Sequence, residues 1–150
     1  MNGMAELITV HRYWKEWSDP RFVVAVIHND DLNQVTWEMR AMEGAPKFAE
    51  SQTLPDVSYA SFAASLGFEA IEVRDADQLA PAWRRAFAAG RPALLDVHCD
   101  PDVPPIPPHA TFEQMKEAAR ALMAGDEDAH GVLRTGIKQK LQEFLPGQKG

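Results

Sequence analysis

Several features are scarce in this sequence, and each scarcity narrows what the protein can be. Cysteine occurs once, at Cys99, so an internal disulfide is excluded and a reducing, cytoplasmic setting is expected. No apolar run approaches the ~20 residues of a membrane span, and the N-terminus has no signal pattern of basic and then apolar residues. Basic residues are fewer than acidic ones, which gives a formal net charge of −7. This argues against nucleic acid or an anionic membrane surface as the main partner.

A glycine-rich phosphate loop is also missing, which leaves a flavodoxin-like nucleotide binder without support. What remains is a chain of 150 residues, of which 45% are hydrophobic. That length and composition are sufficient for one domain with a substantial core.

The run Phe22–Ile27 holds six apolar residues, mostly β-branched. It predicts a strand buried on both faces, as in the middle of a parallel sheet. The run ends in the polar residues 28–31, His-Asn-Asp-Asp. Ligands of open α/β sheets collect beyond the carboxyl ends of the strands, and oxygen-bearing side chains suit Mg²⁺ with a phosphate ligand. The alternative is a polar turn that caps the strand, since Asn and Asp tolerate tight turns.

The rest of the chain alternates apolar strands with periodic helices, which predicts an α/β fold with three layers and a parallel sheet. Two further strands are expected at Ala70–Val73 and Ala93–Val97, followed by a helical tail. The expected helices are 1–17, a helix carrying Tyr59 to Leu66, Asp77–Ala89, Phe112–Met123 capped by Thr111, and Val132–Phe144 with Leu133 on its apolar face.

Three details of this prediction concern local chemistry. Pro81 is tolerated only near the first turn of a helix, so Asp77 is preferred over Asp75 as the cap. The buried stripe of that helix is expected at Leu79, Trp83 and Ala86. The segment 32–57 is expected to be long and irregular, which in a compact domain indicates a functional loop.

His98 and Cys99 end the last expected strand. Together they could ligate a metal ion. The preferred interpretation is a strand terminus with a small buried thiol.

One pattern is more specific: an apolar run, then His28-Asn29, then Asp31-Leu32-x-x-Val35-x-Trp37. It resembles the C-terminal, diphosphate-binding domain of thiamine diphosphate enzymes, in particular the acetolactate synthase and pyruvate oxidase group. In that family a motif begins with Gly-Asp-Gly and ends, about thirty residues on, in Asn-Asn at the tip of a buried strand. The segments 90–101 and 107–116 resemble the closing strand and tail of the same family.

The resemblance implies a set of site residues. Asn29 through its side-chain oxygen and Asp31 through its backbone carbonyl would be Mg²⁺ ligands. Thiamine diphosphate would lie near Asn2 and Gly3 at the start of the first helix. The resemblance also implies that the segment 32–57 carries a short helix and then a mobile flap over the cofactor and substrate. Candidates to line that site are Leu32, Gln34, Val35 and Trp37, with packing under the sheet as the alternative for Val35 and Trp37.

Two departures from the family pattern shape the expectation. His28 stands where the first Asn of the pair is expected, and no Gly-Asp-Gly precedes Phe22. Residues 1–103 are therefore interpreted as the diphosphate-binding domain without its first strand and Gly-Asp-Gly. Residues 104–150 are interpreted as a proline-rich connector and helical tail.

The function implied is part of a 2-oxo-acid-processing enzyme that binds thiamine diphosphate and Mg²⁺. Its partner would be a pyrimidine-binding domain, in the parent enzyme or a partner subunit, and a homo-oligomer is expected. No catalytic acid or base is assigned in this chain, which is expected to bind cofactor weakly and to be inactive alone. The alternative is an α/β interaction module that kept the fold and lost the cofactor.

Overall fold

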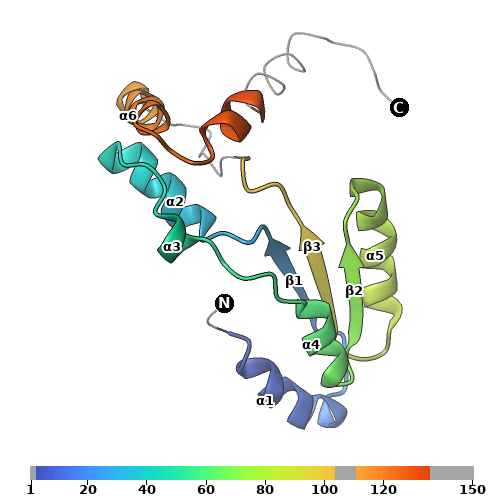
Figure 1. Ribbon diagram of the computed structural model, residues 1–150. Helices are drawn as coiled ribbons and strands as arrows, with labels where there is room; N and C mark the ends of the chain where they lie inside the picture. The colour runs from blue at the N-terminus through green and yellow to red at the C-terminus, as the bar shows by residue number, and fades with distance from the viewer. Residues whose placement is uncertain (1–2, 104–110, 136–150) are drawn as a thin grey trace. The chain divides into compact units, whose positions relative to one another are not determined.

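The computed structural model describes residues 3–103 and 111–135 (Figure 1). The chain divides into two compact units, which we describe one at a time. The first unit consists of Met1–Asn29 and Asp56–Cys99, and the second of Asp30–Pro55 and Asp100–Gly150.

The first unit is built on a parallel sheet. Its described strands are β1 (Val23–His28), β2 (Glu69–Val73) and β3 (Ala93–His98), in the spatial order β1-β3-β2. Both pairings are parallel, because each connection between strands includes a helix that returns the chain to the same end of the sheet. The predicted parallel arrangement is therefore confirmed.

Helices cover both faces of this sheet (Figure 1). On one face, α1 (Glu6–Tyr13) and α4 (Tyr59–Ser65) bring Leu7, Tyr59 and Ala63 against the strands. On the other face, α5 (Ala76–Ala88) packs its alanines against β2 and β3. The three-layer α/β fold is confirmed. The first helix is shorter than expected, and a 3-10 turn, Trp14–Glu16, follows it.

Strand β1 corrects one expectation, because it is buried on one face only. Val26 is 7% exposed and packs in the core beneath α1 and α4, whereas Ile27 is 65% exposed. Ile27 pairs with Val97 on the face where α5 covers β2 and β3. In the described residues β1 pairs with β3 alone and is an edge strand of the sheet. Helix α5 packs on β2 and β3 and does not reach Ile27 of β1, which therefore stays exposed.

Helix α5 corrects two more expectations. Its N-cap is Asp75 and not Asp77, and Pro81 lies inside the helix. The side chain of Gln78 accepts hydrogen bonds from the N–H groups of Arg74 and Asp75, at 2.9 and 3.2 Å. This capping arrangement fixes the start of the helix despite the proline.

The buried stripe of α5 is also shifted. Ala82 and Ala86 are buried and Trp83 is half-buried, whereas Leu79 is 37% exposed. Small residues at positions i and i+4 form one narrow face, and this alanine face, not Leu79, meets the sheet.

The second unit is mainly helical. Its elements are α2 (Asn33–Glu38), a π-helical turn (Met39–Glu43), α3 (Ala49–Gln52) and α6 (Phe112–Met123), and residues 129–135 are helical as well. Residues 33–43 are continuous helix. The expectation of an irregular segment is therefore wrong over that range, whereas the short helix that the resemblance implies is present. Gly44 ends the helix with φ +59°, a left-handed conformation that glycine adopts without steric cost.

The prediction for α6 is confirmed, including its cap. The hydroxyl of Thr111 accepts a hydrogen bond from the N–H of Gln114, and the Gln114 side chain accepts one from the N–H of Thr111. In the following helix Val132 is buried and Leu133 is exposed, which corrects the expected apolar face. The connector 104–110 and the expected helix beyond residue 135 lie outside the described residues.

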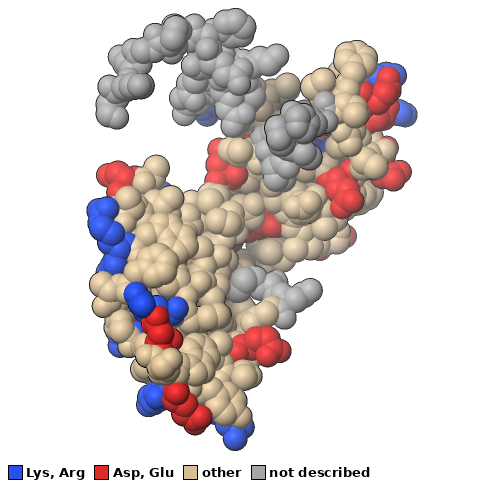
Figure 2. All heavy atoms as spheres, turned by 180° about the vertical axis from the view of Figure 1, so that it is seen from behind, with Lys and Arg blue, Asp and Glu red and all other residues tan. Residues whose placement is uncertain are grey.

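The surface mixes acidic and basic side chains, with broad uncharged areas between them on the face that Figure 2 presents. Among the described residues, no helix is long and apolar enough to cross a membrane.

The first prediction contrasts two leucines. Leu94 is fully buried at the centre of β3 and Leu79 lies exposed on α5. Leu94→Ala should lower the free energy of unfolding by about 2–5 kcal/mol, through lost burial and the cavity left behind. Leu79→Ala should change it by no more than about 0.5 kcal/mol. Urea denaturation of both variants checks this, and equal losses would show that the core is misplaced.

Candidate functional site

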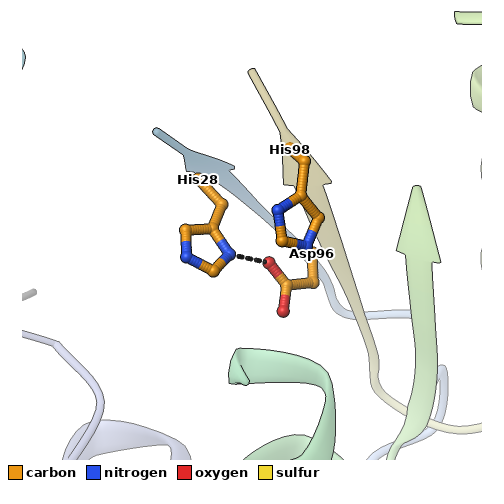
Figure 3. Close-up of side chains that lie close together, drawn as sticks. All are labelled: His28, Asp96 and His98. Atoms are coloured by element: carbon orange, nitrogen blue, oxygen red, sulfur yellow. Dashed lines mark hydrogen bonds and ion pairs between the residues drawn. The ribbon is translucent and has the colours of Figure 1, made fainter. Parts of the chain in front are cut away.

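A cluster of titratable side chains lies at the carboxyl end of the parallel sheet (Figure 3). His28 and His98 are the last residues of β1 and β3, and they are partners in the strand register. Asp96 precedes His98 by two residues and therefore projects from the same face of β3. The register thus brings together three residues that lie up to 70 positions apart in the chain.

His28 and Asp96 form a buried pair. The Nδ1 atom of His28 lies 2.7 Å from Oδ1 of Asp96, and both side chains are almost inaccessible to solvent. The other oxygen of Asp96 accepts a hydrogen bond of 3.1 Å from the backbone N–H of Ala60 in α4. A buried carboxylate is costly unless such partners satisfy it, so this pair fixes both side chains.

Two rings flank His28. Tyr59 meets it edge-on, with the ring centroids 4.8 Å apart. The centroid of the His98 ring lies 4.4 Å from that of His28, and the two ring planes are tilted by 31°. The Nε2 atom of His28 is 4.0 Å from the carboxylate of Asp56, which is exposed. The imidazole of His28 is therefore held in one orientation.

His98 forms the more accessible part of the cluster. Its Nε2 atom lies 3.0 Å from Oε1 of Glu72 in β2, and its side chain is 21% exposed. Glu72 also pairs with Arg74. Cys99 is exposed, which corrects the expectation of a buried thiol. The atoms around its sulfur still shield part of the thiol from water, and this desolvation raises its pKa.

The polar residues predicted to bind Mg²⁺ follow β1 directly. Asn29 is half-buried and is the last residue of the first of the two chain segments that form the first unit. Asp30 has φ +52°, in the left-handed region that Asn and Asp tolerate better than most residues. The backbone therefore turns locally at Asp30.

Asp31 is buried within the second unit. Its carboxylate accepts a hydrogen bond from the hydroxyl of Thr36, at 3.0 Å, and lies 3.4 Å from Nζ of Lys47. Asp31 also forms a short antiparallel bridge with Thr53. These contacts engage its side chain, whereas the predicted Mg²⁺ ligand is its backbone carbonyl. Joint ligation by Asn29 and Asp31 stays a prediction.

The other predicted site residues have different environments. Leu32 and Val35 are exposed. This exposure is compatible with lining a site, and that role stays a prediction. Trp37 is buried within the second unit, where the Arg40 guanidinium lies 4.8 Å from its ring centroid. Its role in lining the site and its packing under the sheet both stay predictions. Gly3 is exposed in the turn before α1. Asn2 lies outside the described residues.

A buried ionic network holds the segment that carries Asp31. Arg40 is almost inaccessible and donates hydrogen bonds to the carboxylates of Asp126, at 2.5 and 2.8 Å, and Asp128, at 3.0 Å. Lys47 pairs with Asp128 at 3.2 Å as well as with Asp31. Charges removed from water are stable only when paired in this way. The π-helical turn that carries Arg40 and the chain after α6 are therefore fixed to each other.

The sequence analysis did not single out Asp96 or Glu72. A signal was present, because Asp96 is a carboxylate inside an apolar run, at a position where a strand should be buried on both faces. A buried charge in a central strand requires a partner. The identity of that partner follows only from the strand order and register.

Comparison with known proteins adds two findings. The model of the family described as "Thiamine pyrophosphate enzyme, C-terminal TPP binding domain" matches residues 1–97. A protein of Bacillus subtilis (strain 168), named "Putative thiamine pyrophosphate-containing protein YdaP", is 29% identical over 122 residues, which is 81% of this chain. The chain spans 21% of the length of that relative.

The second prediction concerns the Arg40 network. Burial raises the pKa of Asp126, but hydrogen bonds from Arg40 and from the N–H of Lys47 outweigh it, so the pKa lies below its usual value. The resulting stability is present above the pKa of the unfolded state and is lost as pH falls through the folded-state pKa. Asp126→Ala should cost about 3–5 kcal/mol at neutral pH, because it leaves Arg40 buried with only the partly exposed Asp128 as a partner.

Urea denaturation between neutral and acidic pH tests this prediction. The difference in stability between the wild type and Asp126→Ala should shrink as the pH falls. Glu127→Ala, at an exposed neighbouring position, is the control and should remain close to the wild type. A difference that does not depend on pH would contradict the prediction.

Proposed function

Because the chain belongs to the family of thiamine pyrophosphate enzyme C-terminal TPP-binding domains, we propose that it holds the diphosphate of thiamine diphosphate through Mg²⁺. We further propose that it acts in a 2-oxo-acid-processing enzyme similar to acetolactate synthase or pyruvate oxidase. The observation that carries the proposal is the position of Asn29, directly beyond the carboxyl end of a parallel strand within the matched residues. Ligands of open α/β sheets bind at that position.

The chemistry of the donors fits Mg²⁺. This ion prefers oxygen ligands in near-octahedral geometry and keeps several waters. The side-chain amide of Asn29 and the backbone carbonyl of Asp31 supply two such oxygens, and the left-handed turn at Asp30 lies between them in the chain. Leu32 and Val35 expose apolar side chains just beyond that turn, which supports their role as lining residues.

When bound, the cofactor supplies a carbanion nucleophile and an electron sink for decarboxylation. The part proposed for this chain is to position the diphosphate and balance its charge. No residue of the chain is proposed as a catalytic acid or base. The carboxylate that activates the cofactor and the groups that hold its pyrimidine are assigned to a partner domain.

A second candidate function is a non-catalytic interaction module. It is favoured by the exposed apolar face at Ile27 on the edge strand β1 and by His28 in place of the first Asn of the motif. The two functions differ in one measurable property, which is whether Asn29 contributes to metal-dependent cofactor binding.

The third prediction is that cofactor binding depends on Asn29. The chain alone should bind thiamine diphosphate with Mg²⁺ weakly, because Asn29 and Asp31 leave much of the ion's coordination to water. An extended protein that adds a Gly-Asp-Gly segment and a pyrimidine-binding domain should bind tightly. In that protein Asn29→Ala should weaken binding by at least about tenfold. Titration calorimetry measures the affinity of the chain alone and that of the extended protein with and without the substitution.

Asn33→Ala is the matched control, because it removes the same amide four residues on. Asn33 donates a hydrogen bond to the carbonyl of Pro101 within the second unit, and its loss should leave cofactor affinity within about twofold of the wild type. Unchanged affinity in Asn29→Ala would place the ligand elsewhere. Absence of binding in the extended protein would favour the interaction module.

The fourth prediction concerns self-association, since a homo-oligomer is proposed. Apolar side chains at Ile8, Tyr13 and Trp17 are exposed on and beside α1, and apolar surface of this kind often marks an interface. Sedimentation velocity should show a mass that rises with concentration. Ile8→Glu should reduce that rise, whereas Phe87→Glu, on the opposite layer of the sheet, should not. A monomer at all concentrations would contradict the proposal.

A further inference from the structure

The cluster at the end of the sheet has a property that the proposed function does not use. His28, Asp96 and His98 each offer one ligand atom, and these atoms lie within 4.8 Å of one another. We propose that the three side chains form a binding site for a divalent transition-metal ion such as Zn²⁺ or Co²⁺, with two imidazole nitrogens and one carboxylate oxygen as ligands.

The donor set defines the class of ion. Imidazole suits Zn²⁺, Co²⁺ and Ni²⁺, and a site of two histidines and one carboxylate leaves a coordination position open for water or an exogenous ligand. Mg²⁺ requires oxygen ligands, so this site differs in chemistry from the one proposed at Asn29 and Asp31. The inference rests on the geometry of the first unit and not on the proposed cofactor.

The distances require only a small adjustment. Bonds from Zn²⁺ to nitrogen and oxygen are about 2.0–2.2 Å, so neighbouring ligand atoms in a tetrahedral site stand roughly 3.3 Å apart. The atoms of His28 and Asp96 stand 2.7 Å apart in a hydrogen bond, so the ion takes the place of the shared proton, which is released to solvent, and the pair opens slightly. The widest separation in the cluster stays within 4.8 Å. His98 is the partly exposed member, so its side chain has more room to adjust than the buried pair.

Surrounding groups orient two of the ligands. The N–H of Ala60 holds one oxygen of Asp96 and leaves the other toward His28. Glu72 lies against Nε2 of His98, which leaves Nδ1 for the ion, and the two imidazole rings lie side by side in Figure 3. A carboxylate behind a metal-binding histidine is the usual outer contact in such sites, because it fixes the ring and increases its basicity.

The test uses the full chain, freed of metal by a chelator and titrated with Co²⁺. Visible absorption bands of coordinated Co²⁺ should rise to one equivalent per chain, and Zn²⁺ should displace them. His98→Ala should weaken Co²⁺ binding by at least about tenfold. Glu72→Gln, which removes the charge behind His98 together with the partner of Arg74, should weaken it by up to about tenfold. Zn²⁺ should raise the Tm of the wild type but not that of His98→Ala.

His130→Ala and Cys99→Ser are the controls. His130 is exposed in the second unit, and Cys99 is the exposed neighbour of His98; both variants should keep the wild-type affinity. Circular dichroism of His98→Ala verifies that the fold persists, since His98 lies at the end of its strand. The proposal is overturned if no Co²⁺ bands arise, or if they persist in His98→Ala, or if they vanish in Cys99→Ser.

These outcomes are independent of the proposed function. Thiamine diphosphate with Mg²⁺, titrated into the extended protein, reports on Asn29 and contains no transition metal. Loss of Co²⁺ binding with intact cofactor binding, or the reverse, therefore shows which of the two proposals has failed.

Discussion

The parallel pairing of β3 with both β1 and β2 is the constraint on which the first unit depends. β3 is the central strand of the described sheet, and Leu94 and Leu95, which face its opposite sides, are fully buried. Parallel strands require helical crossovers, which place α5 on one face while α1 and α4 cover the other. The same pairing aligns the carboxyl ends of the strands, so the polar residues that follow the apolar runs gather at one edge.

Asp96 makes this pairing specific. Side chains alternate between the two faces of a strand, so a slip of one residue would turn Asp96 from His28 and Ala60 toward the apolar contacts of α5. A carboxylate buried there without a partner would cost several kcal/mol. The native register instead gives it two hydrogen bonds. His28, at the position where the resemblance led us to expect an amide, therefore has a physical role in this chain as the partner of a buried acid.

Much of the fold could be predicted from the sequence because its signals are local. Apolar runs marked the three strands, and the pattern from Thr111 to Gln114 marked the start of α6. The errors arose where tertiary contacts, and not the local sequence, determine which residues are buried and which segments are ordered. The edge position of β1 exposes Ile27, the alanine face of α5 leaves Leu79 outside, and the ion pairs of Arg40 hold a segment that looked irregular. The histidine–aspartate cluster was missed because His28 and Asp96 meet across 68 residues.

The chain is thus proposed to hold two kinds of donor. Asn29 and the carbonyl of Asp31 offer neutral oxygens, which suit a small, strongly hydrated ion whose charge is balanced mainly by an anionic ligand such as a diphosphate. The cluster of His28, Asp96 and His98 offers imidazoles, and its one carboxylate is already fixed from behind. Such donors hold transition metals without help from a bound anion. Because His28 and Asn29 are adjacent in the chain, the hydrogen bond that fixes the histidine also restrains the backbone that presents the asparagine, and the two proposed sites are physically linked through β1.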